Sequence, residues 1–223
     1  QIAKDIYMSE TTVRRDLKVL QDQNAVQRRY GGAMLISHSH QTSPIDFRIH
    51  ENLREKHAIA DKAIQLIKPG DTVFLDESST TSCLAERLEP QMRLTVVTYS
   101  IRTVMALSRK NITTYCTGGL YNPITTSLQG RSVEDFFAGF NANVAFFSAT
   151  CVSDDGIISD SAEGNVYSKQ TMLKNAQTKV FLCDHSKFGQ TSMRTVCRLE
   201  DVDWAVTDGD WPEKLRERIK GTL

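Results

Sequence analysis

Short apolar runs recur from Thr72 to the end of the chain, and longer stretches with helically spaced apolar residues separate them. The runs lie at 72–75, 94–97, 113–116, 144–147, 179–183 and 204–207. Four or five β-branched and aromatic residues without polar alternation are typical of strands buried on both faces, and the helix-patterned segments between them suit right-handed crossovers. The pattern therefore predicts an α/β domain with a mainly parallel sheet.

A helical pattern precedes the first of these runs. Within residues 47–67, one apolar stripe contains Ile59, Ala63 and Ile67, and the turn KPGD over 68–71 closes the helix. The polar stretch SHSHQTSP comes before this helix and ends at Pro44. We therefore predict a linker over 36–46 and a second domain over 47–223.

The N-terminal segment carries a second amphipathic helix. Its N-cap is Ser9, its inward stripe is Val13, Leu17 and Leu20, and it ends at Asn24. Thr11, Arg15 and Lys18 repeat the same spacing on the opposite face, where a recognition helix meets base edges, and Arg14 is placed to reach phosphate. The alternative is an ordinary solvated face, because Arg and Lys are common surface residues.

Residues 25–33 favour the DNA-reading interpretation. The sequence AVQRRYGGA predicts a short hairpin whose arginines and tyrosine suit contacts with phosphate and the minor groove. A helix followed by such a wing predicts that residues 1–35 form a DNA-binding domain with operator DNA as its partner. The candidate DNA contacts are Ser9, Thr11, Thr12, Arg14, Arg15, Lys18, Arg28, Arg29 and Tyr30.

Composition narrows the picture. The 223 residues carry a formal net charge of zero and are 40% hydrophobic, enough for a full core, so affinity for DNA has to come from local positive charge. The five cysteines are scattered and never form a CxxC pair, which indicates reduced thiols in a cytoplasmic protein and no zinc site. We expect no cofactor, no metal, no signal peptide and no membrane span.

Polar residues follow the predicted strands. Asp76, Ser78, Ser79, Thr80 and Thr81 follow the first, Thr98, Tyr99 and Ser100 the second, and Gly118 and Gly119 the third, while Gly130 precedes a later helix. Ligands of parallel sheets bind at the carboxyl ends of strands, and helix N-termini favour anions. These residues predict one pocket for a small phosphorylated polyol; simple helix caps and tight turns are the alternative.

Two later segments add candidates to this pocket. Lys187, in DHSKFG after the fifth run, offers a positive charge to phosphate, and Glu163 is placed to bind sugar hydroxyls. Asp154, Asp155, Asp160 and Glu163 are also the candidate bases for the alternative function, a sugar-phosphate isomerase. Acidic, glycine-containing loops such as SDDGIISDSAEG are usually solvated turns, so we expect a protein that is not an enzyme.

SETTVRRDLKVL followed by RRYGGA resembles the winged helix-turn-helix of the DeoR family of bacterial transcriptional regulators. DESSTT, TYS, GG and DHSKFG lie where that family has DxGTTT, TNS, GG and D-x-SKFG. The resemblance implies a repressor of a carbohydrate-metabolism operon, controlled by a phosphorylated sugar. It also implies an effector domain similar in fold to ribose-5-phosphate isomerase and the CoA-transferase-like group. Because such a head reads a half-site, we expect a homodimer or a homotetramer.

The resemblance has two departures and one gap. Ser78 stands where the family usually has Gly, which narrows the approach of the backbone to a ligand, and Tyr99 stands where it usually has Asn. We expect the Tyr99 ring to stack on a sugar or to wall it off. Only eight residues precede Ser9, whereas the family has two further helices there, so we expect an incomplete and loosely held reading head.

Overall fold

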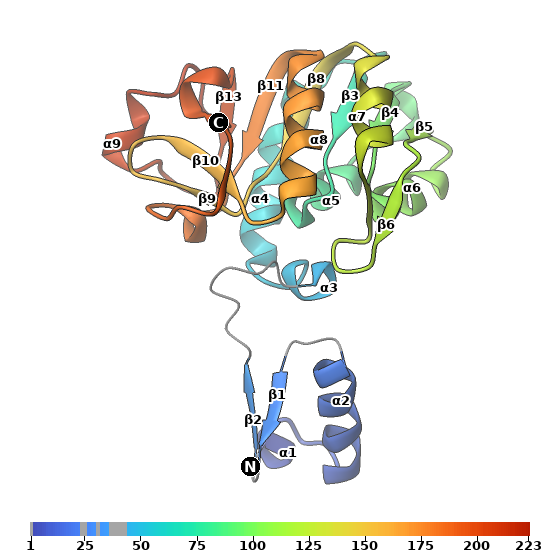
Figure 1. Cartoon of the computed structure of the whole chain (residues 1–223), viewed down its shortest axis with the longest axis vertical. Coiled ribbons are helices and arrows are strands. Elements are labelled where there is room, and N and C mark those ends of the chain that lie inside the picture. The colour runs from blue at the N-terminus through green and yellow to red at the C-terminus, as the bar shows by residue number, and fades with distance from the viewer. Residues whose placement is uncertain (1, 23–25, 30–31, 36–43) are drawn as a thin grey trace. The chain divides into compact units, whose positions relative to one another are not determined.

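The computed structural model describes residues 2–22, 26–29, 32–35 and 44–223. The chain divides into two compact units, Gln1–Pro44 and Ile45–Leu223 (Figure 1). Within the described ranges, no helix is long and apolar enough to cross a membrane.

The first unit contains the predicted helix and hairpin. Helix α1 spans Ile2–Asp5, α2 spans Glu10–Asp22, and strands β1 (Val26–Arg29) and β2 (Gly32–Leu35) pair antiparallel. Val13 of α2 and Val26 of β1 are buried, and Leu17 and Leu20 are half-buried, as the inward stripe requires. The predicted end of the helix, Asn24, lies outside the described residues.

The second unit is built on a six-stranded parallel sheet. Its strands are β3 (Thr72–Leu75), β4 (Thr95–Thr98), β5 (Thr113–Cys116), β8 (Ala142–Phe147), β11 (Ala176–Leu182) and β13 (Trp204–Val206). They lie in the order β13-β11-β8-β3-β4-β5, and every neighbouring pair is parallel. Each strand coincides with one of the apolar runs to within a few residues, so the predicted α/β fold is confirmed.

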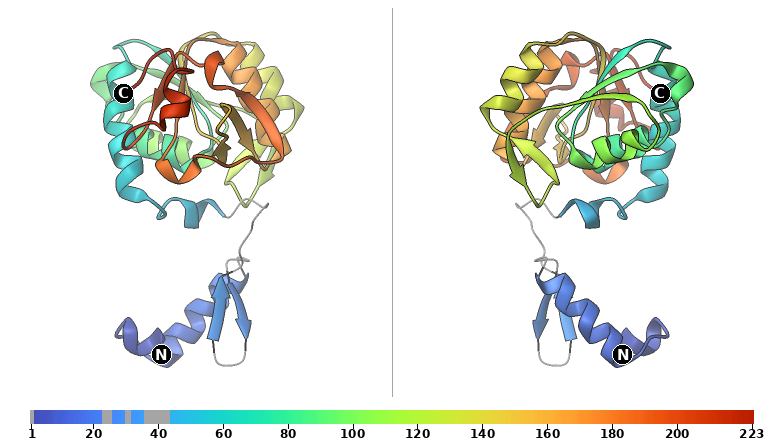
Figure 2. Two further views of the ribbon diagram at one scale, coloured as in Figure 1. Left: turned by 90° about the vertical axis from the view of Figure 1, so that its left-hand side faces the viewer. Right: turned by 90° about the vertical axis from the view of Figure 1, so that its right-hand side faces the viewer.

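Helices cover both faces of this sheet. Helices α4 (Leu53–Ala63), α5 (Ser79–Ala85) and α6 (Ile101–Ser108) pack on one face, and α7 (Arg131–Ala138) and α8 (Glu163–Lys174) on the other. Figure 2 shows α4 and α8 on opposite sides of the unit.

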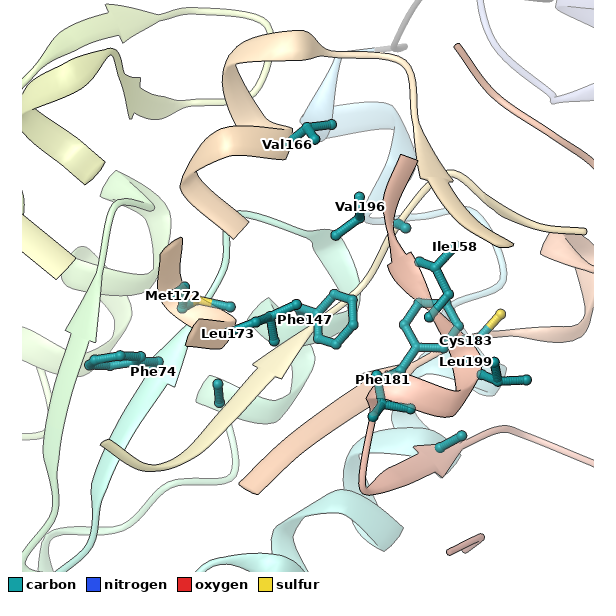
Figure 3. Packing of buried hydrophobic residues seen from close by; sticks show 14 of the residues in the cluster. Phe74, Phe147, Ile158, Val166, Met172, Leu173, Phe181, Cys183, Val196 and Leu199 are labelled. Atoms are coloured by element: carbon teal, nitrogen blue, oxygen red, sulfur yellow. The ribbon is translucent and has the colours of Figure 1, made fainter. Parts of the chain in front are cut away.

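Alternate residues of each strand enter the two cores. In β3, Val73 and Leu75 join Ile59 of α4, whereas Phe74 joins Phe137 of α7. Figure 3 shows the second of these cores, in which Phe74 and Phe147 of the sheet lie near Met172 and Leu173 of α8. Burial on both faces explains why these runs have no polar alternation.

Strand β5 departs from the prediction of full burial. Its residues alternate between exposed and half-buried, and Tyr115 is 46% exposed. The reason is its outer position: β4 is its only neighbour in the sheet, so one edge is open to solvent.

The helix predicted over 47–67 is broken. Helix α3 spans Ile45–Arg48, α4 begins only at Leu53, and the 3-10 turn η1 (Ile64–Leu66) follows α4. Asn52 adopts a left-handed conformation with φ 48° and ψ 43°, which no residue inside a right-handed helix can have. The predicted stripe is nevertheless buried at Ile59, Ala63 and Ile67.

Several elements were not predicted from the sequence. Strands β9 (Cys151–Val152), β10 (Ile157–Asp160) and β12 (Arg194–Arg198) form a small antiparallel sheet, and β6 (Leu120–Asn122) pairs with β7 (Ser127–Gln129). The prediction of a solvated loop over 153–164 was wrong in its centre, because pairing with the distant β12 buries Ile158 and Ser159. The remaining short elements are η2 (Pro90–Met92), η3 (His185–Lys187), η4 (Leu199–Asp201) and α9 (Glu213–Arg216).

Phe137 is the aromatic centre of the core beneath α7. Its ring is buried and meets Phe74 edge-on at 5.0 Å and Tyr99 edge-on at 5.8 Å between centroids. We expect Phe137→Ala to lower the free energy of unfolding by about 3–5 kcal/mol, because it leaves a cavity between these rings. The neighbouring half-buried Phe136 is the control, and urea denaturation that shows equal losses for Phe136→Ala and Phe137→Ala would contradict this assignment.

Candidate functional site

The exposed face of α2 carries the candidate base-reading side chains. Ser9 caps the helix, since its Oγ accepts a hydrogen bond from the Thr12 backbone N at 3.1 Å. Thr11, Arg15 and Lys18 are exposed, opposite the buried Val13. This is the face that the sequence predicts for contact with DNA.

Only weak interactions hold the two arginines of this face. Arg14 lies 3.6 Å from Glu10 and Arg15 lies 3.7 Å from Asp16, in pairs whose side chains are mostly exposed. Exposed ion pairs of this kind contribute little free energy, so both guanidinium groups can exchange their partners for phosphate or bases at little cost.

The wing is the β1–β2 hairpin. Arg28 is exposed and lies opposite Ala33, and the backbone of Arg29 lies opposite Gly32. The Arg29 side chain and the whole of Tyr30, both candidates from the sequence, lie outside what the structure describes.

Polar residues lie at the carboxyl ends of three parallel strands, and Asp76 is the one of them that the sequence named as a candidate effector residue. Asp76 follows β3, Ser148 follows β8, and Asp184 follows β11, all in the interior of the sheet. The Asp76 carboxylate joins two of these ends, because one oxygen accepts the Thr81 hydroxyl at 2.7 Å and the other accepts the Ser148 backbone N at 2.9 Å.

Several hydroxyls that follow β3 form hydrogen bonds within the protein. Ser78 caps α5 by accepting from the Thr81 N at 3.1 Å, and the hydroxyl of Thr81 is committed to Asp76. Ser82 donates to the Ser78 carbonyl at 3.0 Å. The sequence left two interpretations for the hydroxyls of Ser78 to Thr81, contact with a ligand or capping of the helix. In the structure, Ser78 caps α5 and the Thr81 hydroxyl binds Asp76.

Thr80 is different from its neighbours. Its side chain is fully buried, and its hydroxyl has no hydrogen-bond partner among the described residues. A buried hydroxyl without a partner costs free energy, so such groups are rare and call for an explanation. Ser79 lies beside it and is also buried.

Lys187 extends from the η3 turn to the same strand ends. Its Nζ donates to the Ser148 Oγ at 2.7 Å and lies 3.9 Å from an oxygen of Asp184. Although burial favours the neutral acid, Lys187 and hydrogen bonds from Ser186 hold the pKa of Asp184 below its usual range. Lys187 is therefore held by the Asp184 carboxylate and by the hydroxyl of Ser148, whose backbone N binds Asp76.

The polar residues at the end of β4 and just after it form mainly local hydrogen bonds. Thr98 Oγ1 accepts from the Ser100 N at 3.1 Å, and Ser100 Oγ caps α6 by accepting from the Thr103 N at 3.2 Å. Thr117, which precedes the glycine pair, is buried and its hydroxyl has no partner within the described ranges. Thr117 and Ser148 are thus polar strand-end residues that the candidate list from the sequence omitted.

The three candidate glycines differ in what they do. At Gly119, with φ 140°, a Cβ would lie 2.7 Å from the Gln129 carbonyl oxygen, so the close packing of the β6–β7 hairpin explains this glycine without a ligand. Gly130 has φ 102° and is the N-cap of α7. Gly118 has open space around the position of a Cβ.

Two candidate residues are engaged by other side chains of the protein. The Tyr99 ring is fully buried against Phe137, and its hydroxyl donates to Glu77, so it is not exposed to stack on a sugar ring as the sequence suggested. Glu163 is half-exposed and pairs with Arg194. The carboxylate of Glu163 is therefore engaged by a cation from β12.

A buried charge cluster lies beneath the strand ends, and sequence reasoning missed it. Lys169 of α8 is fully buried, and its Nζ lies 2.6 Å from Asp160, 3.3 Å from Glu77 and 3.6 Å from Asp76. Asn165 donates to Glu77 at 2.6 Å and accepts from Gln129 at 2.7 Å. Helical spacing could have indicated that Lys169 is buried, because it lies three or four residues from Val166, Met172 and Leu173 on the buried face of α8.

The protonation of this cluster follows from its burial. Burial raises the pKa of Glu77, with a smaller opposing effect of Lys169, and burial next to Glu77 also raises the pKa of Tyr99. For Lys169 and Asp160, burial favours the neutral forms, but their mutual attraction is stronger, so the pKa of Lys169 is raised and that of Asp160 is lowered. The ammonium of Lys169 is thus paired with the carboxylate of Asp160.

Known proteins match this chain along nearly its whole length. The family model of the DeoR-like helix-turn-helix domain matches residues 1–39, and that of the DeoR C terminal sensor domain matches residues 51–209. The transcriptional repressor AccR of Agrobacterium fabrum is 31% identical over 98% of this chain and 88% of that protein. The lactose phosphotransferase system repressor of Staphylococcus epidermidis is 30% identical over 99% of this chain and 88% of that protein.

Solved structures share the fold at low identity. The delta subunit of eIF2B from Chaetomium thermophilum superposes with a TM-score of 0.54 at 15% identity, covering 74% of this chain and 60% of that chain. The ribose 5-phosphate isomerase A of Methanocaldococcus jannaschii gives a TM-score of 0.47 at 19% identity, covering 62% of this chain and 55% of that chain. At these identities the likeness concerns architecture alone.

We expect Lys169→Met to lower the free energy of unfolding by about 3–5 kcal/mol at neutral pH, because it leaves buried carboxylates without their cation. Lys174→Met, on an exposed position of the same helix, is the control and should change stability little. Urea denaturation of the two variants and the wild type measures both losses.

The deficit of Lys169→Met should shrink in acid. The pKa of Asp160 is lowered from 3.8 in the folded wild type, so its ion pair stabilises the fold above that pH and is lost as the pH falls through the folded pKa. The variant lacks this contribution at every pH. A deficit that stayed constant from pH 7 down to pH 3 would show that packing, rather than charge, explains the role of Lys169.

Proposed function

The chain belongs to the DeoR family of transcriptional regulators, and on that premise we propose that it represses a carbohydrate-metabolism operon under the control of a phosphorylated sugar. A DNA-binding regulator of transcription is what the two matched domains and the relatives support directly. The carbohydrate link is supported by the relative from Staphylococcus epidermidis, which is a repressor of a lactose phosphotransferase system. As a DNA-binding protein of this kind, it would act in the cytoplasm, where bacterial DNA lies.

For DNA recognition, we assign base contacts to the exposed face of α2 and phosphate contacts to its flank and to the wing. Arg15 lies on the exposed face with Thr11 and Lys18, Arg14 is the preceding residue of α2, and Arg28 is exposed in the wing. A bidentate arginine can distinguish guanine from other bases, whereas arginines that bind phosphate fix position only.

For the effector, the unpaired hydroxyl of Thr80 carries the proposal. Thr80 lies in the first turn of α5, where Asp76 binds Ser78 and Thr81, and Asp76 also binds the backbone N of Ser148, whose hydroxyl accepts from Lys187. A phosphate oxygen placed there would accept from Thr80 and lie near the ammonium of Lys187. Charged oxygens gain more from such donors than neutral ones do, so the site favours a phosphorylated ligand over the free sugar.

The acidic residues argue against the alternative, an isomerase. A general base at neutral pH needs a carboxylate that is free to take a proton. Asp160 and Glu163 are engaged by Lys169 and Arg194, and Asp154 lies 3.2 Å from Lys214. A hydrogen bond from Ser153 lowers the pKa of Asp155. These arrangements support a ligand sensor rather than a catalyst.

A winged head reads one half-site, so we propose that the protein binds its operator as a homodimer or a homotetramer. The effector would alter the affinity for operator DNA by changing how two heads are held. A coupling free energy of about 1–3 kcal/mol, the usual range for allostery, is enough to change operator affinity severalfold or more.

The reading face can be tested with operator sites selected by the wild-type protein from a random DNA library. Arg15→Ala should weaken binding to the selected site by about 1–3 kcal/mol and relax the preference at one base position. Arg14→Ala is the matched control on the same helix and should weaken binding to all sequences alike. If Arg15→Ala bound the selected site as the wild type does, the assignment of this face would be wrong.

The effector site can be tested by a thermal-shift screen of sugar phosphates, each compared with its unphosphorylated sugar. For the best ligand, Thr80→Ala and Lys187→Ala should each weaken binding by about 1.5–3 kcal/mol. Thr80→Ala should leave the melting temperature of the free protein almost unchanged, because its hydroxyl has no partner to lose.

Thr81→Ala provides the contrast, since its hydroxyl is bonded to Asp76 and its loss should lower stability without ligand. If Thr80→Ala and Lys187→Ala both bound the ligand as tightly as the wild type does, the assignment of the phosphate to this site would be wrong. If a sugar and its phosphate bound with equal affinity, the phosphate group would not be required for binding.

A further inference from the structure

Residues of α4, α5 and α6, together with the connection between α3 and α4, enclose a cavity of about 390 Å³. This volume lies within the range of about 300–1,000 Å³ that is usual for pockets that bind small molecules. Thr80 and Lys187 do not line the cavity, and Ser79 is the one candidate effector residue that does. The cavity is therefore formed by a different set of side chains from the proposed phosphate site.

Two neighbouring residues of α6 that line the cavity have polar atoms without a partner. Thr103 is only 1% exposed, and its hydroxyl has no hydrogen-bond partner among the described residues. Arg102 pairs through its Nη2 with Asp46 of α3, but its Nε is buried and also has no partner within the described ranges. Buried polar atoms are rarely left unpaired, so a ligand in the cavity is a natural partner for both.

His57 of α4 adds a third donor to the lining. Its Nδ1 lies 3.1 Å from Nη1 of Arg87, and a guanidinium group can only donate, so Nδ1 accepts and the proton of the ring lies on Nε2. Arg87 also donates to the carbonyl oxygens of His57 at 3.0 Å and of Cys83 at 2.9 Å. The ring of His57 is therefore held with a known tautomer, whose Nε2 is a hydrogen-bond donor.

The rest of the lining combines hydrocarbon with a positive balance of charge. Ile49, Leu53 and Ala106 contribute apolar side chains. Arg102 and Arg109 are the two arginines of the lining, and Glu86, which is exposed, is its one carboxylate. A carboxylate ligand has two oxygens that only accept hydrogen bonds, and guanidinium groups bind it well. The lining thus suits an anion that also has an apolar body.

We propose that this cavity is a second ligand site of the protein and that it binds a small carboxylic acid. The carboxylate accepts from the Nε of Arg102 and from the Thr103 hydroxyl, and the apolar body packs against Ile49, Leu53 and Ala106. Because the Nη2 of Arg102 remains with Asp46, the ligand and α3 share one guanidinium group. The inference goes beyond the proposed function, since it adds a metabolite of a second chemical class at a separate place.

The test uses the whole chain, with benzoate and hexanoate as probes and benzamide as the uncharged analogue of benzoate. In isothermal titration we expect both acids to bind saturably, and benzamide to bind about tenfold more weakly than benzoate, because it lacks the charge. Arg102→Gln should weaken binding of benzoate about tenfold or more. Asp46→Asn is the matched control, since it breaks the same ion pair but leaves the guanidinium group in place, and it should keep the affinity.

Two further variants keep the test valid if Arg102→Gln does not fold. Thr103→Val removes the unpaired hydroxyl at nearly constant volume, so it should weaken benzoate binding about tenfold without lowering the melting temperature of the free protein. Ala106→Phe should fill the cavity and abolish binding. Met105→Phe is its control, because Met105 lies in the same helix, is 56% exposed and does not line the cavity.

Each other outcome overturns the inference. If neither acid binds, or if benzamide binds as tightly as benzoate, the cavity is not a carboxylate site. If Ala106→Phe binds benzoate as the wild type does, or if Lys187→Ala loses it, the acid binds elsewhere. None of these results affects the proposed function, which is tested through Thr80 and Lys187 with sugar phosphates, and a failure of that test leaves the cavity and its carboxylate probes untouched.

Discussion

The arrangement of the strand ends depends on one buried cation. Lys169 enters from α8 and meets the carboxylates of Asp76 and Glu77, which follow β3, and of Asp160, at the end of β10. These elements belong to two different sheets, so a single ammonium joins the parallel sheet to the antiparallel one. A buried ion pair contributes little net free energy to folding, because desolvation of the charges offsets their attraction. Removing one partner is nevertheless costly, because the other charge is left buried and unpaired. We therefore infer that the main effect of this contact is to restrict the fold to one arrangement.

Asp76 connects this buried cation to the proposed ligand site. One of its oxygens lies near Lys169 and binds the Ser148 backbone, and the other holds Ser78 and Thr81. The loop that carries Thr80 is therefore positioned before any ligand arrives. Binding a phosphate to a fixed loop avoids most of the entropy of ordering it, which is a general condition for tight recognition of a small anion.

The parallel sheet could be predicted from the sequence, because strands that are buried on both faces consist of short continuous apolar runs such as TVFL and VAFF. The sequence was insufficient for β10 and β12, which owe their pairing to contacts between segments some forty residues apart rather than to a local pattern. The break in the helix at Asn52 is equally non-local, since its side chain bonds to Asp184 and Ser186. The sequence motifs predicted that Asp76, Thr80 and Lys187 lie at the same edge of the sheet. They could not show which hydroxyls form hydrogen bonds within the protein, as those of Ser78 and Thr81 do.

The way in which acidic residues are engaged bears on whether a ligand site can catalyse a reaction. Catalysis requires interactions that strengthen in the transition state, and hence groups that are free to exchange protons, whereas sensing requires only that the ground state of the ligand be bound. Here Asp160 pairs with Lys169, Glu163 pairs with Arg194, and Glu77 accepts hydrogen bonds from Tyr99 and Asn165. By contrast, Lys187 is held by the Ser148 hydroxyl at 2.7 Å and by an Asp184 oxygen at 3.9 Å. If the proposed phosphate site is correct, a ligand would meet this cation rather than a free acid, which favours holding an anion over catalysis.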